Sequence, residues 1–430
     1  MQPADLAIVH ASELVTCRAP ARGAIGTDLQ HLEIITDGAV AVRDGRVVDV
    51  APTADLLRRW AVARVLDAHG RVVSPGLVDS HSHLVYAGSR HAEYESIVTG
   101  NEEASPRLGG GILYTVGQTR RASSAELEAQ AREDLGVMLA HGTTTLEAKS
   151  GYGLDRDTEL RLLAILKGLR HTVDVVPTYL AAHVPPDASD RARGAYVQVV
   201  LDTLPAARAF ANYCDVTCDP VGFTSSECRR IAEEATRLGY RLRVHADQTG
   251  YAGGAELAAD LGAASADHLD YVSETGIAAL AAAGTTGVLV PGVTFHMMET
   301  MAGVRNGAVT GPVKPFLAET VHRMIERGVR LAIATDYNPG SSPTPSLQMA
   351  MQLAARIYRL SYAAVWHMST INAAHALDRG DDRGSIEIGK RADLVIWDVP
   401  EHGMVINTFG VNLVDRVIKD GTVVVGRTEQ

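Results

Sequence analysis

Short apolar segments alternate with amphipathic segments through the middle of the chain, and this alternation restricts the possible folds more than any other feature. Eight apolar segments are typical of β-strands: 77–79, 143–147, 173–181, 214–217, 241–245, 265–268, 286–290 and 329–335. Between them, apolar residues recur every three or four positions, as in α-helices, at 125–139, 158–169, 225–238 and 319–327. Strands that alternate with helices form a parallel sheet, and eight such units close into a barrel. The sequence therefore predicts an α/β fold with a (β/α)8 TIM barrel.

The two ends of the chain have a different pattern, in which short apolar runs are separated by turn residues. Residues 38–50 and 414–425 each read as two short strands joined by an Asp-Gly turn. This pattern is typical of β-hairpins. We therefore predict three segments: an N-terminal part at 1–74, a barrel at 75–381 and a C-terminal part at 382–430. The two terminal parts are expected to pair into one small β-sandwich domain.

The composition limits the partners of this protein. Its 430 residues include 40 Lys and Arg against 51 Asp and Glu, which gives a formal net charge of −11. A surface that binds nucleic acid or anionic lipid needs an excess of basic residues. We therefore expect a small-molecule substrate, with no nucleic acid and no membrane surface as a partner.

No targeting or membrane segment is predicted. The first residues include Asp5 and no basic cluster, unlike a secretory signal peptide. The uncharged stretch at 275–295 has the length of a membrane span, but Gly284 and Pro291 interrupt it. The few cysteines, which are Cys17, Cys214, Cys218 and Cys228, fit buried free thiols. Together these features predict a protein of the reducing cytoplasm.

Potential metal ligands follow four of the predicted strands. His81 and His83 come after the first strand, His245 ends the fifth, His268 ends the sixth, and Asp336 follows the eighth. A His-x-His pair alone is more often two surface histidines, and polar residues also cap strand ends. In a TIM barrel, however, the carboxyl ends of the strands form the active site. Imidazoles and a carboxylate there could hold a divalent ion, which lowers the pKa of bound water from about 15.7 toward 7. The pattern predicts a hydrolytic metal centre.

The chain resembles the amidohydrolase superfamily and, within it, the imidazolonepropionases, which open the ring of 4-imidazolone-5-propanoate in histidine degradation. The resemblance spans nearly the whole chain, and its matching stretches are 75–83, 84–90, 109–112, 142–145, 149–154, 245–248, 265–269 and 334–342. Two of these stretches, 149–154 and 334–342, are far more specific than the His-x-His pair. The resemblance implies ring opening to N-formimidoyl-L-glutamate by attack of metal-activated water on the ring carbonyl.

The resemblance also implies residue roles. Its metal ligands would be His81, His83, His245 and Asp336, and its catalytic groups would be Asp336, His268 and Gln248. The substrate would contact Arg90, Tyr152, His183, Gln248, Asn338, Gly340 and Ser341. These roles are chemically reasonable, because a guanidinium binds a carboxylate tail with two parallel hydrogen bonds. A glutamine amide can both donate to and accept from a ring amide.

One divalent metal is expected. Three imidazoles and a carboxylate suit Zn²⁺, although Fe²⁺ and Mn²⁺ also accept these ligands. Lys149 could in principle be a carboxylated lysine that bridges two metals, but it belongs to the Lys-Ser-Gly-Tyr motif, so a single metal is predicted. The resemblance further implies a homodimer.

One loop departs from the family pattern and keeps two alternatives open. The family usually has a tyrosine three residues after the glycine that corresponds to Gly100, whereas Glu103 stands here, with Arg107 nearby. An acid would repel a carboxylate tail unless another group compensates. The first alternative is a sister amidohydrolase that hydrolyses or deaminates a different small cyclic amide or amidine; a deaminase would release ammonia. The second is a scaffold without turnover.

Overall fold

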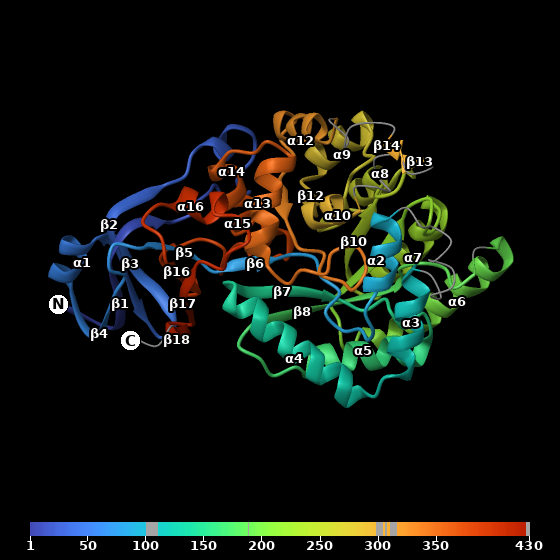
Figure 1. The fold of residues 1–430 in the computed structure, drawn as a ribbon, viewed down its shortest axis with the longest axis horizontal. Helices are drawn as coiled ribbons and strands as arrows, with labels where there is room; N and C mark the ends of the chain where they lie inside the picture. The colour runs from blue at the N-terminus through green and yellow to red at the C-terminus, as the bar shows by residue number, and fades with distance from the viewer. Residues whose placement is uncertain (100–110, 188, 298–303, 306–307, 310–315, 427–430) are drawn as a thin grey trace.

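A parallel β-barrel forms the centre of the protein. The computed structural model describes residues 1–99, 111–187, 189–297, 304–305, 308–309 and 316–426. The barrel strands follow the order of the chain around the sheet (Figure 1). They are β6 (Leu77–Asp79), β7 (Thr143–Lys149), β8 (Asp174–Ala182), β9 (Tyr213–Cys218), β10 (Arg241–Ala246), β11 (Ser265–His268), β12 (Thr286–Leu289) and β15 (Leu331–Ile333). All eight predicted strands are present, with every end within two residues of the prediction.

Residues at the carboxyl ends of β6 and β15 close the barrel. The Asp79 carboxylate accepts hydrogen bonds from the Thr335 amide at 3.0 Å and the Thr335 hydroxyl at 2.6 Å. Just beyond, the Asp336 amide donates to the His81 carbonyl at 3.0 Å, and the His83 amide donates to the Tyr337 carbonyl at 2.8 Å. The first and last strands are therefore joined where the predicted metal ligands begin.

Helices cover the outside of the barrel (Figure 1). They are α2 (His91–Val98), α3 (Gly111–Arg121), α4 (Ser124–Ala140), α5 (Arg156–Gly168), α6 (Asp190–Ala207), α7 (Ser225–Arg237), α8 (Gly254–Asp260), α9 (Glu274–Ala283), α10 (Pro291–His296), α12 (Phe316–Glu326), α13 (Leu347–Ile357), α14 (Tyr362–Met368) and α15 (Ile371–Ala376). Local sequence fixes several helix starts. At α4 and α7 the side chains of Ser123 and Thr224 accept from the third helical amide, and Glu126 and Glu227 complete two capping boxes.

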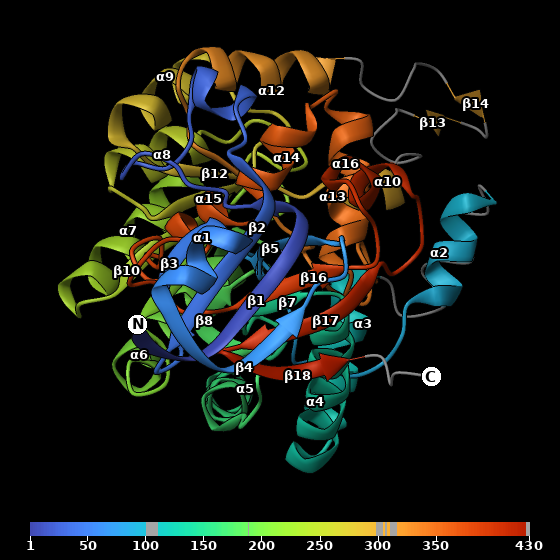
Figure 2. The ribbon, with the colours of Figure 1, turned by 90° about the vertical axis from the view of Figure 1, so that its left-hand side faces the viewer.

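Both ends of the chain contribute to one further sheet, which lies beside the barrel (Figure 2). Its strands are β1 (Gln2–Val15), β2 (Ile34–Arg43), β3 (Arg46–Pro52), β4 (Trp60–Asp67), β5 (Val72–Pro75), β16 (Leu394–Trp397), β17 (Val414–Lys419) and β18 (Thr422–Gly426). The order is β18-β17-β16-β5-β1-β2-β3, and β4 pairs with β1. Leu6 and Val40 from the N-terminal part share a core with Leu394 and Ile418 from the C-terminal part. The expected fold class is confirmed.

Five short elements complete the secondary structure of the described residues. A 3-10 turn, η1 (Gly26–Gln30), follows β1, and α1 (Thr53–Arg59) connects β3 to β4. Near the C-terminus α16 (His402–Asn407) lies between β16 and β17. Strands β13 (Val304–Arg305) and β14 (Ala308–Val309) pair only with each other.

The structure describes the cysteines and the uncharged stretch at 275–295, for which predictions were made, but it does not describe the loop after residue 99. All four cysteines are buried free thiols, as expected. The uncharged stretch at 275–295 divides into α9, β12 and α10. Among the described residues, no helix has the length and apolar composition needed to cross a membrane. The loop that contains Gly100, Glu103 and Arg107 lies outside the described residues.

A buried lysine joins the terminal sheet to the barrel. Lys419, at the end of β17, has a side chain only 5% exposed. Its ammonium donates to Asp393 Oδ2 at 2.6 Å and to Asp174 Oδ2, on the first residue of β8, at 2.8 Å. A charge removed from water is stable only when such partners compensate it.

We expect Lys419→Met to destabilise the protein without changing the metal site. The substitution leaves the carboxylate of Asp393 buried without its ammonium, and breaking a buried ion pair costs roughly 3 kcal/mol. Urea unfolding followed by circular dichroism measures the loss. A free energy of unfolding equal to that of the wild type would show that Lys419 does not stabilise this joint.

Candidate metal centre and active site

The predicted metal ligands converge at the carboxyl ends of the barrel strands. Three overlapping groups of side chains have ligand atoms within 4.8 Å of one another. They are His81 with His245 and His268, His83 with His183 and His245, and His81 with His83 and Asp336. The ring centroid of His81 is 4.6 Å from that of His245 and 5.2 Å from that of His268. Residues far apart in the sequence thus form one cluster.

Several buried atoms of this cluster have no hydrogen-bond partner among the described residues. They are Nε2 of His81, Nε2 of His245, both ring nitrogens of His268 and Oδ1 of Asp336. Their residues are at most 4% exposed, and burying such groups unpaired is costly. Asp336 Oδ1 lies 3.4 Å from His81 Nε2 and 3.3 Å from His83 Nε2. A divalent cation with nitrogen and oxygen ligands fits this donor set.

The electrostatics of the cluster favour the metal-binding forms of Asp336 and His268. Burial and the charge of Lys149 lower the pKa of His81, but Asp336 and Asp267 outweigh them and raise it to about 9, so His81 must lose a proton when metal binds. Burial raises the pKa of Asp336, but the neighbouring His81 and His83 outweigh it and hold that pKa well below its usual range. Burial lowers the pKa of His268 well below its usual range, which leaves a neutral imidazole. Metal ligation requires neutral histidine and ionised carboxylate. Asp336 and His268 therefore have the required protonation states without any rearrangement.

The backbone is also unusual at two of these strand ends. His268 has a φ of 77° and Asp336 a φ of 48°, in the left-handed region that non-glycine residues rarely adopt. Such conformations persist where the surrounding structure imposes them, commonly at functional sites. The hydrogen bond from the Asp336 amide to His81 is one such restraint.

Two carboxylates that the sequence analysis missed lie behind the imidazoles. Asp267 Oδ2 is 2.7 Å from His81 Nδ1, and Asp215 Oδ2 is 3.0 Å from His245 Nδ1. Carboxylates in this position orient metal-binding imidazoles and fix their tautomers. The available signal was their place inside apolar strands, because Asp215 and Asp267 interrupt β9 and β11.

Asp247, in the predicted motif after β10, has a structural role. Its Oδ1 accepts hydrogen bonds from the amides of Ala252 and Gly254, and its Oδ2 accepts from the amide of Ala255. These amides belong to the start of α8, which has no side-chain cap of its own. Asp247 therefore holds the loop that follows His245 rather than the metal cluster.

Tyr152 and His183, which the resemblance assigns to substrate binding, lie against the metal cluster. The His183 ring stacks on His83 with centroids 4.9 Å apart and planes 9° apart. The Tyr152 ring lies 5.5 Å from both His83 and His183. His183 Nδ1 is 3.1 Å from the Gly151 carbonyl, which anchors the ring.

Arg90 and the loop after Asp336 lie against each other. A Cβ atom added to Gly340 would lie only 1.9 Å from Arg90 Nη1, so the guanidinium requires glycine there. The Asn338 side chain accepts from the amides of Gly340 and Ser341 and fixes this loop. Glu93, which the sequence analysis did not single out, pairs with Arg90 at 3.0 Å to Nε and 2.5 Å to Nη2. Nη1 is left on the side of Gly340.

Gln248 differs from the other predicted residues. Its backbone amide donates to Asp219 Oδ2 at 2.8 Å, which holds the start of the loop after β10. Its side chain makes no hydrogen bond to the metal cluster within the part of the chain that the structure describes.

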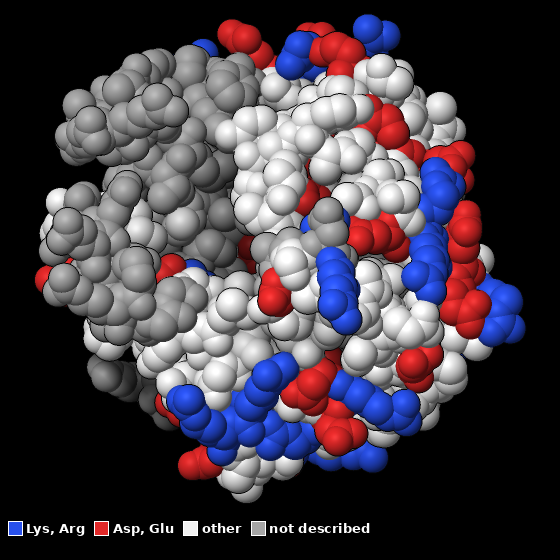
Figure 3. Space-filling model, turned by 90° about the vertical axis from the view of Figure 1, so that its right-hand side faces the viewer, with Lys and Arg blue, Asp and Glu red and all other residues white. Residues whose placement is uncertain are grey.

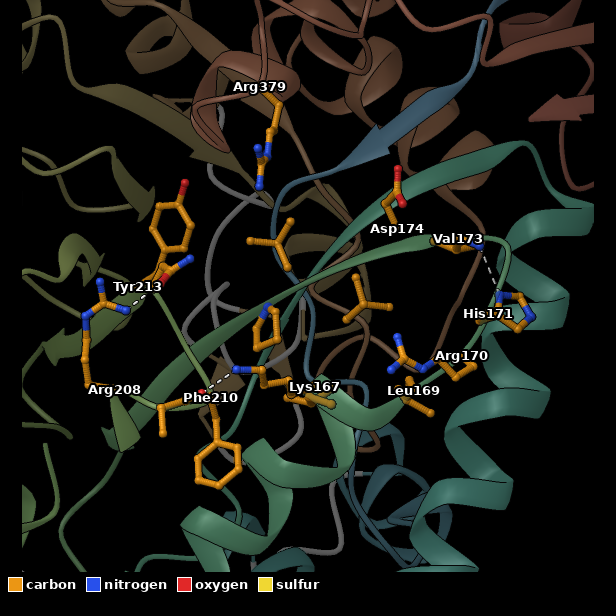
Figure 4. Close-up of a pocket in the computed structure, with 16 residues that line it drawn as sticks. Lys167, Leu169, Arg170, His171, Val173, Asp174, Arg208, Phe210, Tyr213 and Arg379 are labelled. Atoms are coloured by element: carbon orange, nitrogen blue, oxygen red, sulfur yellow. Dashed lines mark hydrogen bonds between the residues drawn. The ribbon is translucent and has the colours of Figure 1, made fainter. Parts of the chain in front are cut away.

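A separate cavity of about 610 Å³ lies at the opposite ends of β8 and β9 (Figure 4). Lys167, Arg170, Arg208 and Arg379 line it, together with His171 and Tyr213. Lys167 donates to the Ala209 carbonyl and Arg208 to Asn212, so two of the four cations are engaged. None of the predicted site residues lines this cavity. This cavity lies at the amino ends of the strands. In TIM barrels the residues at this face stabilise the fold, and the active site lies at the opposite face.

The charges on the visible face at the right-hand side of the molecule are mixed. Figure 3 shows Lys and Arg interspersed with Asp and Glu there, without one large basic field. Ion pairs among the described residues include Arg193 with Glu227 and Arg237 with Glu234.

The barrel and its ligand cluster define the class of protein. Residues 72–424 match the amidohydrolase family, and residues 38–61 match the imidazolonepropionase-like composite domain of bacteria. The chain belongs to the amidohydrolase family.

Sequence relatives narrow this class. The chain is 40% identical to the imidazolonepropionase of Bacillus velezensis, over 94% of this chain and 93% of that protein. It is 41% identical to the imidazolonepropionase of Geobacillus kaustophilus, over 98% of both chains. These similarities place the chain in the imidazolonepropionase family.

Solved structures support the fold at lower identity. An adenosine deaminase from Xanthomonas campestris with bound zinc has a TM-score of 0.68 at 22% identity, over 99% of this chain and 94% of that one. A 5-methylcytosine deaminase from Klebsiella pneumoniae has a TM-score of 0.71 at 17% identity, over 99% of both chains. The shared architecture extends over nearly the whole chain.

We expect His245→Ala to abolish metal retention. The wild-type protein should contain about one divalent ion per chain, and loss of one imidazole ligand should leave well under half of that after dialysis. Elemental analysis of the purified proteins measures the content. His31→Ala, at an exposed position, is the matched control and should retain the metal. A full metal content in His245→Ala would remove His245 from the ligand set.

Proposed function

We propose that this protein is a metal-dependent hydrolase that opens the ring of 4-imidazolone-5-propanoate to N-formimidoyl-L-glutamate, a step of histidine degradation. The observation that carries this proposal is the unpaired cluster of imidazoles and Asp336 at the barrel mouth. It occurs in a chain about 40% identical to imidazolonepropionases over nearly its full length. The reaction adds one water across a ring C–N bond and releases no second product.

The metal is proposed to be one Zn²⁺ ion, held by His81, His83, His245 and Asp336. The buried, unpaired ligand atoms support this set, and imidazole with carboxylate suits zinc. When bound, a divalent cation supplies Lewis-acid chemistry, because it lowers the pKa of water and polarises a carbonyl group. Lys149 Nζ pairs with Asp215, Asp267 and Glu147, which supports a single ion. A carboxylated, anionic lysine would repel these three carboxylates.

Asp336 and His268 are proposed to move protons during ring opening. The ionised Asp336 can accept a proton from the attacking water through a carboxylate oxygen. His268 is neutral and nearly fully buried, so its one ring nitrogen without a hydrogen can accept this proton from Asp336 and pass it to the departing ring nitrogen. Both side chains lie in the same cluster, with the His268 ring 5.1 Å from that of His245.

The propanoate tail is proposed to bind at Arg90, beside Tyr152 and His183. The guanidinium presents Nη1 toward the loop of Gly340, and a carboxylate there would gain a charge-assisted hydrogen bond. Tyr152 and His183 contact His83, one of the proposed metal ligands. Gln248 is proposed to bind the ring amide, and Asn338, Gly340 and Ser341 to line the product side.

Three organisational features are also proposed. Residues 1–74 and 382–430 are taken as one small β domain, and residues 75–381 as the catalytic barrel. The shared core of Leu6 and Leu394 supports this division. The buried free thiols fit a reducing cytoplasm. A homodimer follows from the family resemblance.

A second candidate substrate class rests on the Arg90 contacts. Glu93 already occupies Nε and Nη2 of Arg90, so a tail carboxylate would have to share the cation. A neutral cyclic amide or amidine would avoid this competition. We retain such a sister amidohydrolase activity as the alternative, and release of ammonia would identify a deaminating version.

We expect rapid, metal-dependent ring opening by the purified protein. Urocanase supplies 4-imidazolone-5-propanoate in place, loss of its ultraviolet absorbance gives the rate, and mass spectrometry detects formimidoyl-glutamate. Asp336→Asn should lose most turnover, because it loses both the anionic ligand and the proton acceptor. No conversion by metal-loaded wild-type protein would contradict the proposed substrate, and ammonia from another cyclic amidine would support the alternative.

Gly340→Ala should weaken substrate binding rather than folding. The added Cβ would collide with Arg90 Nη1, so the guanidinium must move away from the tail site. Loss of one charge-assisted hydrogen bond corresponds to a rise in KM of about tenfold, with kcat less affected. Gly117→Ala is the matched control, because a Cβ at that α3 position meets no atom within 4 Å. An unchanged KM in Gly340→Ala would move the tail site elsewhere.

A further inference from the structure

A fully buried lysine lies among the carboxylates beneath the metal cluster. Lys149 ends β7, and its side chain is 0% exposed. Its ammonium is 2.7 Å from Asp215 Oδ2, 3.3 Å from Asp267 Oδ2 and 3.0 Å from Glu147 Oε1. An ammonium has three hydrogens to donate, and three carboxylates surround this one.

Two of these carboxylates are the groups that orient histidines of the cluster. The Asp267 oxygen that faces Lys149 is also the oxygen 2.7 Å from His81 Nδ1. The Asp215 oxygen that faces Lys149 is likewise the one 3.0 Å from His245 Nδ1. Asp215 Oδ1 additionally accepts from the His245 amide at 3.2 Å. A single ammonium therefore connects the supports of His81 and His245.

The backbone groups of Glu147 and Lys149 bind the segment that carries His81 and His83. The Lys149 amide donates to the carbonyl of Ser82, the residue between the two histidines after β6, at 2.9 Å. Ser82 Oγ donates to the Glu147 carbonyl at 2.6 Å. The end of β7 is thus fastened directly to the His81-Ser82-His83 segment.

The charges explain why this lysine must be cationic. Asp215, Asp267 and Glu147 are all fully buried, and Arg243 approaches Glu147 only at 3.7 Å. Although burial alone raises the pKa of Asp267, the Lys149 ammonium and the hydrogen bond to His81 hold it below its usual range. Without Lys149 these anions would repel one another in a medium that screens charge poorly.

We propose that Lys149 is a positioning residue of the metal centre: through Asp215 and Asp267 it fixes the imidazoles of His245 and His81 in one common arrangement. This inference rests on the proposed metal ligands. Lys149 touches neither the metal nor the substrate in this account. Because Asp215 and Asp267 both pair with the Lys149 ammonium, loss of the lysine loosens the two ligands His245 and His81 at once. Mutation of supporting groups of this kind typically lowers metal affinity by about 10- to 100-fold.

Lys149→Met tests the proposal, with Lys419→Met as the matched control. Lys419 is also a buried lysine that bridges two aspartates, Asp174 and Asp393, but it lies in the terminal sheet. Both variants therefore lose a buried bridging ammonium, and only one loses it beneath the cluster. Three readouts are compared: the zinc dissociation constant by competition with a chromophoric chelator, the visible spectrum of the cobalt-loaded protein, and the urea midpoint of the metal-free protein.

We expect Lys149→Met to bind zinc about 10- to 100-fold more weakly and to shift the cobalt absorption bands. Lys419→Met should lower the urea midpoint and leave both metal readouts at wild-type values. If Lys149→Met changes only the urea midpoint, as the control does, Lys149 is merely structural and the proposal is overturned.

Lys149→Arg decides the matter if the methionine variant does not fold. Arginine keeps the charge, but its planar fork cannot place one nitrogen against both Asp215 and Asp267 as an ammonium does. We expect a folded protein with weakened zinc binding and a shifted cobalt spectrum, whereas wild-type values would overturn the proposal. A wild-type protein that binds no metal would instead refute the metal centre itself, and would do so before any variant is compared.

Discussion

The rest of this structure depends on one constraint: imidazoles with ring nitrogens that have no hydrogen-bond partner among the described residues converge at the mouth of a closed barrel. Parallel strands bring their carboxyl ends to one edge, and closure through Asp79 and Thr335 brings the first and last strands together there. His81 and Asp336 become neighbours only because of this closure. Buried ligand atoms without partners are costly, so a cation at this position would stabilise the arrangement as well as provide chemistry.

Below that edge, the polar groups inside the barrel form successive layers. Imidazoles lie uppermost, Asp215 and Asp267 support them, and Lys149 connects these carboxylates. A barrel interior is normally filled with branched apolar side chains. Charges in this interior therefore serve the site, and each has a partner that offsets its loss of hydration. The cavity at the other ends of β8 and β9 has no comparable order.

The strands, the fold class and the convergence of His81, His245 and Asp336 could be predicted from the sequence because they follow local rules. The eight apolar segments have the length and flanking turns of buried strands, and His81, His245 and Asp336 stand at their ends. Contacts across the barrel could not be predicted in this way. Asp215 and Asp267 are single polar residues within strands, and nothing in the sequence indicates which imidazole each one meets.

The substrate side of the site was predicted less completely. Arg90 and Gly340 were assigned to the substrate site separately, and nothing in the sequence indicated their contact with each other. The pairing of Arg90 with Glu93 depends on the start of α2, which was not predicted. Gln248 was assigned by motif alone, and its observed contacts concern its backbone. Side chains that bind a ligand produce weaker periodic patterns in the sequence than side chains that pack in the core.

Anomalous diffraction from crystals of the zinc-loaded protein tests the central claim most directly. We predict one zinc peak per chain in the anomalous difference map. Its nitrogen ligands should come from His81, His83 and His245 at about 2.0–2.1 Å, and its oxygen ligand from Asp336 at about 2.0–2.2 Å. A peak at the cysteines, or a second peak bridged by Lys149, would contradict it.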